Sequence, residues 1–570
     1  MHVIKSQKSK VKNFLLALVL LFSCSEDEKT SVPELVVGRE EMSFSREVSS
    51  QKLGIKSNVQ WAITNSELWC TVSPASGEAG TFSIDVEVLE NQTILAREAI
   101  LTITAQGLTE SVTVKQGGLP FMVAGDKVYM AGFHSETISI TIDASEEYSV
   151  SFSDDWITAS TVSDTKRDYI IAANNELANR EGSITFSYGT FSETVTIVQS
   201  GAPLTVPADK TGVESDAAAL AAKMLAGWNA GNSLEACSSP FVASETMWGN
   251  PPISQTLIDA VKAAGFNAIR IPCAWSGYIE DRTTHRIRSN WLARVKEVVD
   301  YAVEAGMYAI INIHWDGGWL EENPVFAMQE SVNEKQKALW EQIAVYFRDY
   351  DERLLFAGTN EVRANYGTPT TEHVTVQMSY NKTFVDAVRS TGGKNAWRNL
   401  IVQAYNTNID HAVQFMEMPI DNVVDRLMLE VHYYDPYYFT INETSIEYLW
   451  GKDFADRSPN VSNWGQEDWA DAQFDKMKTN FIDKGIPVIL GEYSATFRAN
   501  LPLPALNDHI KSRHDFLYYI TKSAHQRGLV PFYWDNGSTG NFGSGLFNRA
   551  TGEQVHSEAI KAIMDGAKHR

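Results

Sequence analysis

Eight short apolar runs recur between residues 224 and 534, and amphipathic stretches separate them. The runs are Met224–Trp228, Ala268–Pro272, Tyr308–His314, Leu354–Thr359, Leu400–Ala404, Leu427–His432, Pro487–Glu492 and Val530–Trp534. The stretches between them with helical apolar spacing include Trp291–Ala305, Lys335–Arg348, Ala470–Lys484 and His514–Arg527. Eight strand–helix units in about 350 residues predict a (β/α)8 TIM barrel over residues 220–570. A doubly wound sheet is the alternative, but no glycine-rich dinucleotide turn follows the first run.

Nearly every one of these runs ends in a side chain that can bind or react. These residues are Asn229, Arg270, His314, Asn360 with Glu361, His432 with Tyr434, Glu492 and Trp534. A parallel barrel has its active site at the C-terminal ends of its strands, so we expect these side chains to converge on one mouth. Each of them alone has an ordinary structural explanation, but their joint occurrence at strand ends does not.

Glu361 and Glu492 are the glutamates that lie directly at predicted strand ends. Cleavage of a glycosidic bond needs two carboxyl groups across one cleft, one protonated to assist the leaving oxygen and one ionised. His314 and Asp316 are a possible metal-ligand pair, but no third ligand follows at a recognised spacing. No G-x-S-x-G nucleophile motif is present either. The pattern therefore predicts glycoside hydrolysis without a metal or cofactor.

The residues around these strand ends resemble glycoside hydrolase family 5 of clan A. The matching segments are Leu354-Leu-Phe-Ala-Gly-Thr-Asn360-Glu361-Val362, Ile489-Leu-Gly-Glu492-Tyr, Ile269-Arg270-Ile-Pro272, Ile313-His314-Trp315, Val431-His432-Tyr-Tyr434 and Tyr533-Trp534. Gly227-Trp228-Asn229 with Gly231-Asn232-Ser-Leu-Glu235 resembles the opening of subfamily 4, the endoglucanase and xyloglucanase group. Ala357 and Val362 depart from the family pattern, at positions away from the catalytic atoms.

The resemblance implies a retaining endo-β-1,4-glucanase acting on cellulose-type or mixed-linkage β-glucan. It implies that Glu361 is the general acid/base and Glu492 the nucleophile, with carboxyl groups about 5–5.5 Å apart. The supporting residues that it implies are Arg270, Asn360, His432 and Tyr434, and the substrate-binding residues are Asn229, His314, Trp315, Trp319 and Trp534. Xyloglucan or mannan are alternative substrates for the same mechanism. A glycan-binding protein with a vestigial barrel is the alternative from another class.

The N-terminal segment has the composition of an export signal. Four lysines within residues 1–13 precede the apolar run Phe14–Phe22, which is too short to span a bilayer. Leu21-Phe22-Ser23-Cys24 resembles a bacterial lipobox, and Ser25-Glu26-Asp27-Glu28 resembles the acidic export signal of Bacteroidetes surface lipoproteins. We therefore expect a lipoprotein signal peptide over 1–23, lipidation of Cys24, an acidic linker over 24–34 and an outer membrane location facing the exterior. A plain signal peptide with an incidental cysteine is the alternative.

A tandem duplication precedes the barrel. Glu110–Gly118 (ESVTVKQGG) and Glu193–Gly201 (ETVTIVQSG) are offset by 83 residues, which aligns Gln116 with Gln199. The same offset relates Asn91 to Asn174 and Arg97-Glu98 to Arg180-Glu181. Alternating apolar residues predict two all-β, immunoglobulin-like sandwiches over 35–118 and 119–202, followed by a linker over 203–219. Both copies resemble the BACON domain, which leaves two roles open: a spacer or a carbohydrate-binding module.

Charge and cysteine content limit the partners of the chain. The net charge of −23 excludes the basic footprint that nucleic-acid binding requires. Four cysteines in 570 residues are too few for a disulfide scaffold. We expect a monomer whose partners are a β-glucan polysaccharide or oligosaccharide and, through the lipid anchor, the outer membrane.

Overall fold

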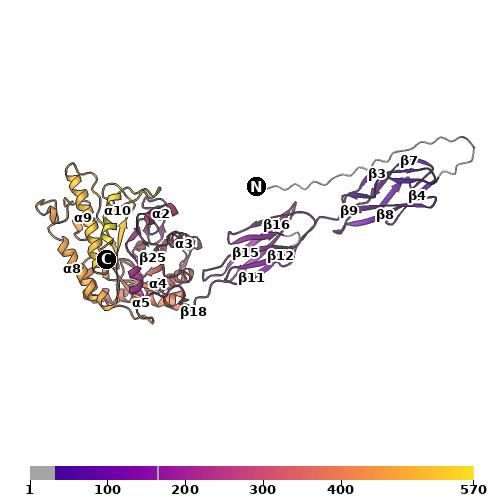
Figure 1. Ribbon diagram of the computed structural model, residues 1–570. Coiled ribbons are helices and arrows are strands. Elements are labelled where there is room, and N and C mark those ends of the chain that lie inside the picture. Colours follow the sequence, from indigo (N-terminus) through magenta and orange to yellow (C-terminus); the bar gives the residue numbers. More distant parts are fainter. Residues whose placement is uncertain (1–31, 163–165, 570) are drawn as a thin grey trace, which may run out of the picture.

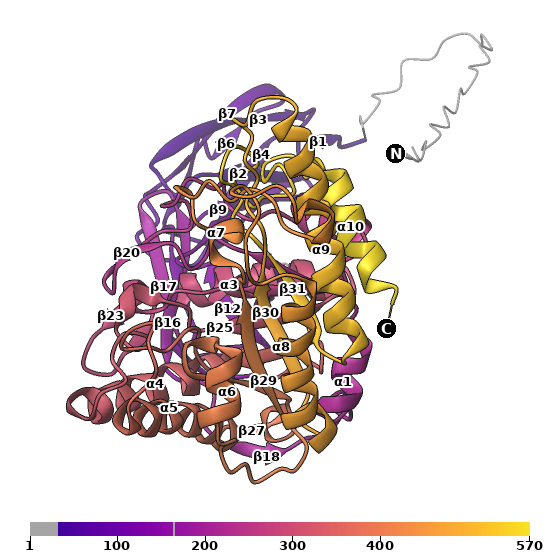
Figure 2. The ribbon, with the colours of Figure 1, turned by 90° about the vertical axis from the view of Figure 1, so that its left-hand side faces the viewer.

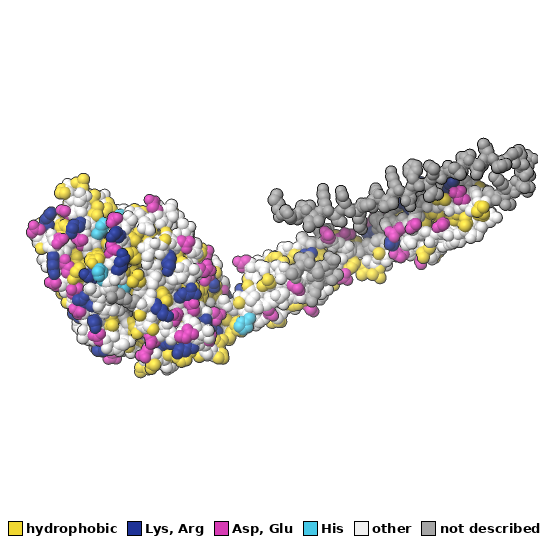
Figure 3. All heavy atoms as spheres, in the orientation of Figure 1, with side chains coloured by type: hydrophobic (Ala, Val, Ile, Leu, Met, Phe, Trp, Pro, Cys, Tyr) yellow, Lys and Arg dark blue, Asp and Glu magenta, His cyan; other side chains and the backbone are white. Residues whose placement is uncertain are grey.

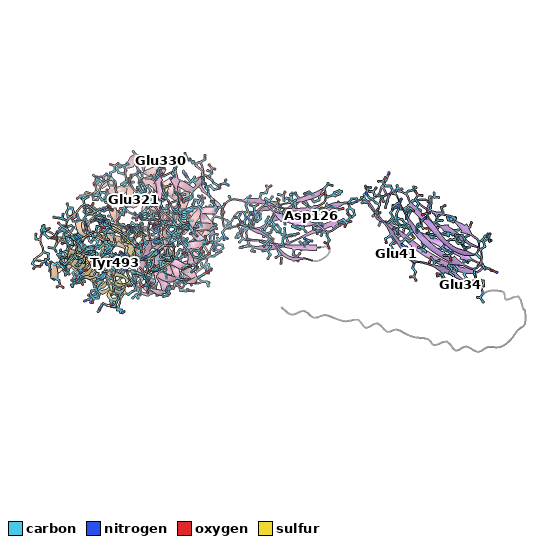
Figure 4. All side chains as sticks on the ribbon, turned by 90° about the horizontal axis from the view of Figure 1, so that it is seen from above. Glu34, Glu41, Asp126, Glu321, Glu330 and Tyr493 are labelled. Carbon is cyan, nitrogen blue, oxygen red and sulfur yellow. The ribbon has the colours of Figure 1, made fainter. Side chains whose placement is uncertain are left out.

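The computed structural model describes residues 32–162 and 166–569 (Figure 1). The predicted signal peptide 1–23, Cys24 and the linker up to residue 31 lie outside the described residues. Three bodies follow one another along the molecule, and Glu41, Asp126 and Tyr493 mark them in turn in Figure 4. Acidic and basic side chains are interspersed on the face of the barrel seen in Figure 3. Within the described ranges, none of the helices combines the length and hydropathy that a membrane span needs.

The first body is a sandwich of two mainly antiparallel sheets with strand orders β1-β3-β7-β5 and β2-β9-β8-β4-β6. Its strands are β1 (Leu35–Val37), β2 (Glu41–Phe44), β3 (Ser49–Ser57), β4 (Trp61–Asn65), β5 (Cys70–Ser73), β6 (Ser76–Gly77), β7 (Gly80–Val88), β8 (Arg97–Ala105) and β9 (Leu108–Gln116). Alternate residues of the long strands are buried, and Trp61 lies in the core between the sheets.

The second body repeats this plan with strand orders β10-β12-β15-β14 and β11-β17-β16-β13. Its strands are β10 (Met122–Ala124), β11 (Val128–Ala131), β12 (Glu136–Ala144), β13 (Ser149–Phe152), β14 (Ile157–Val162), β15 (Lys166–Ile171), β16 (Arg180–Tyr188) and β17 (Phe191–Gln199). The prediction of two all-β domains ahead of a barrel is confirmed.

The landmarks that revealed the duplication form the same contacts in both copies. Arg97 lies 4.3 Å above the ring of Trp69, and Arg180 lies 4.3 Å above Trp156. Each arginine also donates from Nε to the glutamine opposite it on the last strand: Arg97 to Gln116 at 2.9 Å and Arg180 to Gln199 at 2.8 Å. In each sandwich the arginine therefore connects the last β-hairpin to the loop that carries the tryptophan.

The segment 203–219, predicted as a linker, instead packs against the barrel. Its strand β18 (Val206–Ala208) pairs in parallel with β27 (Gly392–Gly393). Nη2 of Arg348 donates to the carbonyl oxygens of Pro203 and Leu204 at 2.8 and 2.7 Å. Helix α1 (Ala217–Lys223) then packs its apolar side against the inward residues at the N-terminal ends of the barrel strands. Contacts of this kind, between residues far apart in the sequence, leave no local sequence pattern.

The third body is a closed barrel of eight parallel strands. In barrel order they are β19 (Gly227–Ala230), β22 (Ala268–Ile271), β25 (Tyr308–Asn312), β26 (Leu354–Ala357), β28 (Leu400–Gln403), β29 (Leu427–Tyr433), β30 (Val488–Tyr493) and β31 (Val530–Asp535). β31 pairs with β19 and closes the ring. All eight predicted strands are present, because fully buried parallel strands read as continuous apolar runs.

Helices surround the barrel (Figure 2). They are α2 (Gln255–Ala263), α3 (Ser289–Glu304), α4 (Phe326–Tyr346), α5 (Thr371–Ser390), α6 (Ile409–Phe415), α7 (Tyr437–Thr440), α8 (Glu467–Asn480), α9 (Ala505–Gln526) and α10 (Ser557–Ala567). Two small hairpins, β20 (Cys237–Ser239) with β21 (Val242–Ala243) and β23 (Ile279–Asp281) with β24 (Arg286–Ile287), lie in the loops. Helix α4 begins at Phe326 rather than Lys335, and its first turn exposes Phe326 and Met328 instead of burying them on the face used for the prediction.

The pairing of β18 with the barrel predicts the effect of a methyl group at Gly392. A Cβ there would lie 1.8 Å from the carbonyl oxygen of Val206, so Gly392→Ala should detach β18 and expose residues 203–209 to protease. Gly485→Ala is the matched control, because Gly485 also has a positive φ but no atom within 4 Å of its Cβ position. Both variants carry a backbone cost of about 1–2 kcal/mol. Limited proteolysis with mass spectrometry should show faster cleavage in Gly392→Ala alone, and equal rates would contradict the docking.

Candidate active site

A cleft of about 920 Å³ opens at the C-terminal ends of the barrel strands. Its lining residues are His314, Asn360, Glu361, Tyr366, Asn406, Thr407, Asn408, Ile409, Asp410, His432, Tyr433, Tyr434, Asp435, Tyr437, Ile441, Gln473, Glu492 and Trp534. Most of the predicted site residues are among them, including both glutamates. The βα-loops after β28 and β29 and one residue of α8 add a wall that the strand ends alone did not predict.

Glu361 and Glu492 face each other across this cleft with His432 between them. Nδ1 of His432 lies 2.7 Å from Oε1 of Glu361 and 3.7 Å from Oε2 of Glu492. One carboxylate oxygen from each glutamate and one imidazole nitrogen all lie within 4.8 Å of one another. The two carboxyl groups are therefore close enough to act on the same atom of a bound molecule.

Glu492 is held by two donors. Nη1 of Arg270 and the hydroxyl of Tyr434 each lie 2.9 Å from one of its carboxylate oxygens. Arg270 is fully buried and also donates from Nη1 to Oδ1 of Asn229 and from Nη2 to Oδ1 of Asn360. These contacts favour the ionised form of Glu492, because a charge-assisted hydrogen bond is stronger than one between neutral groups.

Asn360 and Glu361 are fixed from below by a carboxylate of the β25–α4 loop. Oε2 of Glu321 accepts from Nδ2 of Asn360 at 3.0 Å and from the backbone N–H of Glu361 at 3.2 Å. Arg363 forms an ion pair with the same carboxylate. In Figure 4 Glu321 lies within the outline of the barrel domain, while Glu330 lies at its periphery. Glu321 thus sets the direction of the Asn360 amide.

His314 and Trp534 form one aromatic face of the cleft. Their rings are stacked with centroids 5.8 Å apart and planes 6° apart. Burial lowers the pKa of His314 well below its ordinary value, and the positive charges of Arg270 and His432 act in the same direction. A neutral imidazole beside an indole presents an apolar, polarisable surface suited to the face of a sugar ring.

Burial and mutual repulsion control the titration of the carboxyl pair. Burial raises the pKa of Glu492, against the opposing charges of His432 and Arg270, and the charge of Glu361 raises it further. Burial acts on Glu361 in the same direction, but the hydrogen bond and charge of His432 outweigh it and lower the pKa of Glu361. Because one imidazole contacts both carboxylates, the three groups gain and lose protons as one unit.

Asn229 does not line the cleft, so its predicted role in substrate binding is corrected. Its side chain is fully buried and donates to the backbone oxygens of Gly491 and Tyr533 at 2.9 and 3.2 Å. Its remaining oxygen accepts from Arg270. The residue supports the guanidinium instead of a sugar.

Trp315 and Trp319 are also absent from the lining of the cleft. Trp319 donates to Asp316 at 2.7 Å, and the Lys335 ammonium lies 3.9 Å above its ring, so this indole packs within the β25–α4 loop. Trp315 is partly exposed beside Trp248, with ring centroids 6.4 Å apart. Strand-end reasoning cannot separate such loop tryptophans from cleft residues, because their direction depends on the loop.

Sequence reasoning missed two buried carboxylates beneath the cleft, Glu321 and Glu430. Glu430 is 1% exposed, and its Oε1 lies 2.9 Å from Nε of Arg270 and 3.2 Å from Nε2 of His432. Its other oxygen accepts from Gln403 at 2.6 Å. Glu430 could have been identified from the sequence, because it is a glutamate within an otherwise apolar strand. It lies two residues before His432 and therefore shares the same inward face.

Glu361, His432 and Glu492 also have the residue types of a metal site, and within 32–162 and 166–569 no other such group of three occurs. Both imidazole nitrogens of His432 already lie against carboxylates, which raises the pKa of His432 to about 10 despite burial. An imidazolium has no lone pair to offer a metal. The donor set therefore fits a proton-transfer site better than a cation site.

Comparisons with known proteins agree with this geometry. The family model described as Cellulase (glycosyl hydrolase family 5) matches residues 232–540. The BACON family model, described as a putative binding domain, matches residues 59–117 and 144–200.

Two of the following three similar proteins cover nearly the whole of this chain, and the third covers 61% of it. The xyloglucan-specific endo-β-1,4-glucanase of Bacteroides ovatus is 42% identical, covering 98% of this chain and 97% of its own length. Endoglucanase A of Paenibacillus barcinonensis is 38% identical over 61% of this chain and 90% of its own. The solved Bacteroides ovatus GH5 xyloglucanase with a XXXG heptasaccharide has a TM-score of 0.61 at 36% identity, covering 94% of this chain and 100% of that one. The chain therefore belongs to glycoside hydrolase family 5.

Proposed function

We propose that this endo-β-1,4-glucanase cleaves internal bonds in the glucan backbone of xyloglucan with retention of configuration. The observation that carries retention is the position of Glu361 and Glu492, whose oxygens lie within 4.8 Å of each other. Retaining enzymes have carboxyl groups about 5–5.5 Å apart, whereas inverting enzymes need about 6.5–9.5 Å to admit a water.

The reaction takes two steps at one anomeric carbon. In the first step Glu492 attacks that carbon, and Glu361 passes the proton that it shares with Nδ1 of His432 to the departing glycosidic oxygen, which leaves a glycosyl ester on Glu492. In the second step Glu361 takes a proton from a water molecule, whose oxygen attacks the same carbon and releases Glu492 as a carboxylate. The roles follow from position: Glu492 receives Arg270 and Tyr434, which stabilise an anion, and Glu361 faces the more open side with 24% of its side chain exposed.

The shape of the cleft supports a branched substrate. Besides the two glutamates, the cleft is lined by residues 406–410, by Gln473 of α8, and by Tyr437 and Ile441. A linear chain needs only a groove along its backbone, whereas a xylosyl branch needs room beside it. Asn408, Asp410 and Gln473 supply amide and carboxylate groups for sugar hydroxyls on that side. The name of the full-length relative from Bacteroides ovatus supports the same substrate.

The two glutamates are distinguished by the anomeric form of an azide product. With an activated aryl β-glycoside and added azide, Glu492→Ala should give the α-glycosyl azide, because azide replaces the nucleophile. Glu361→Ala should give the β-glycosyl azide, because azide attacks the glycosyl ester on Glu492. On polysaccharide, Glu361→Ala should lose roughly 10²–10⁴ in rate. NMR of the products decides, and the same anomer from both variants would contradict the assignment.

Substrate preference is tested on xyloglucan, carboxymethyl-cellulose, mixed-linkage glucan, glucomannan and xylan. The wild type should have its highest initial rate on xyloglucan. Asp410→Trp should lower that rate roughly tenfold or more, because the indole would fill the space proposed for the xylosyl branch. The rate on unbranched glucan should stay unchanged. Asp410→Asn keeps the volume and is the matched control. Equal losses on branched and unbranched glucans in Asp410→Trp would contradict a branch pocket at this wall.

We also propose that Cys24 is lipidated and anchors the chain on the outer face of the outer membrane. The basic segment, the run Phe14–Phe22 and the acidic residues after Cys24 support this location. Cys24→Ala should leave the chain unlabelled by a fatty-acid probe and release it from the membrane fraction. Protease added to intact cells should cut the wild type, and full protection would contradict surface exposure.

A further inference from the structure

Glu430 occupies the centre of the polar layer beneath the cleft. It lies in β29, two residues before His432, and its carboxylate contacts Arg270, His432 and Gln403. Arg270 and His432 are the cations that touch Glu492 and Glu361. One buried anion thus holds the two positive groups on which both catalytic carboxylates depend.

The neighbouring strand is shaped around this carboxylate. A Cβ placed on Gly491 would lie 2.0 Å from Oε1 of Glu430. No side chain fits at that position while Glu430 keeps its place, so the residue before Glu492 is a glycine. Gly491 therefore leaves the space that the side chain of Glu430 fills.

The positive charges of Arg270 and His432 compensate the buried negative charge of Glu430. Burial alone would raise its pKa, but Arg270 and His432 lower it to about 2. In turn, His432 has a carboxylate at each ring nitrogen, and a neutral imidazole with one N–H satisfies only one of them. Among the described residues, Glu361, Glu430 and Glu492 contact His432, and the charge of His432 also acts on His314. Arg270 and Tyr434 lie against the same carboxylates, Arg270 on Glu430 and Glu492 and Tyr434 on Glu492.

We propose that Glu430 is a positioning residue of the hydrolysis, which keeps His432 protonated and Arg270 oriented against the two catalytic carboxylates. The proposal rests on the function proposed above. Without the anion, His432 can lose the proton that it shares with Glu361, and Arg270 loses the contact that fixes its Nε. Glu361 and Glu492 would then remain in place but with altered protonation.

The test is Glu430→Gln in the full chain, which keeps the shape of the side chain and removes its charge. With ¹⁵N-labelled histidine, and with His432→Gln to identify the signal, the titration midpoint of His432 should fall from about 10 toward its ordinary 6.5. Hydrolysis should fall roughly tenfold or more, a part of the 10²–10⁴ that a positioned acid contributes. The pH–rate profile should change shape together with the His432 titration.

Asp421→Asn is the matched control, because Asp421 is a buried partner of Arg389 outside the cleft. It should lower thermal stability and leave the His432 titration unchanged. Glu430→Asp keeps the charge but withdraws it from both partners, so an intermediate midpoint is expected, and it replaces Glu430→Gln if that variant fails to fold. A folded Glu430→Gln with the wild-type titration and pH profile overturns the proposal. The titration needs no substrate, so it separates this outcome from a wild type that cuts no glucan.

Discussion

The active site depends on one buried guanidinium. Arg270 carries its charge into the buried interior of the barrel, where an unpaired cation is prohibitively costly. Two carboxylates, Glu430 and Glu492, form ion pairs with it, and the side-chain oxygens of Asn229 and Asn360 accept from Nη1 and Nη2. These partners come from four other strands or strand ends. A single charged group therefore fixes how the mouth of the barrel is assembled, and removal of one partner leaves the others with an uncompensated charge.

Much of the barrel could be predicted because its strands are buried on both faces and end in polar residues. The positions of Glu361, Glu492 and His432 followed from this rule alone. The rule fails for residues whose side chains are oriented by contacts with distant parts of the chain. Asn229 ends a strand but turns under Arg270, and Trp319 is held in its loop by Asp316 and Lys335.

The sandwiches were predictable for a different reason. A duplicated sequence preserves the residues that each copy needs, so Arg97 with Gln116 and Arg180 with Gln199 stand out by their spacing. How the second copy meets the barrel has no such signature. Ser289 of α3 donates to Glu176 at 2.9 Å, and segment 203–219 adds a strand and a helix to the barrel. These contacts join unlike parts of the chain and become visible only in the fold.

The glycine that precedes Glu492 carries an evolutionary consequence. A side chain at position 491 would occupy the space of the Glu430 carboxylate, so position 491 cannot gain a side chain while Glu430 keeps its place. A lineage that gains any side chain at 491 must first lose or shorten the residue at 430, and a lineage that loses Glu430 is released from the need for glycine. The order of substitutions at positions 430 and 491 therefore matters. A change at 491 is accessible by a single substitution only after Glu430 has been replaced or shortened.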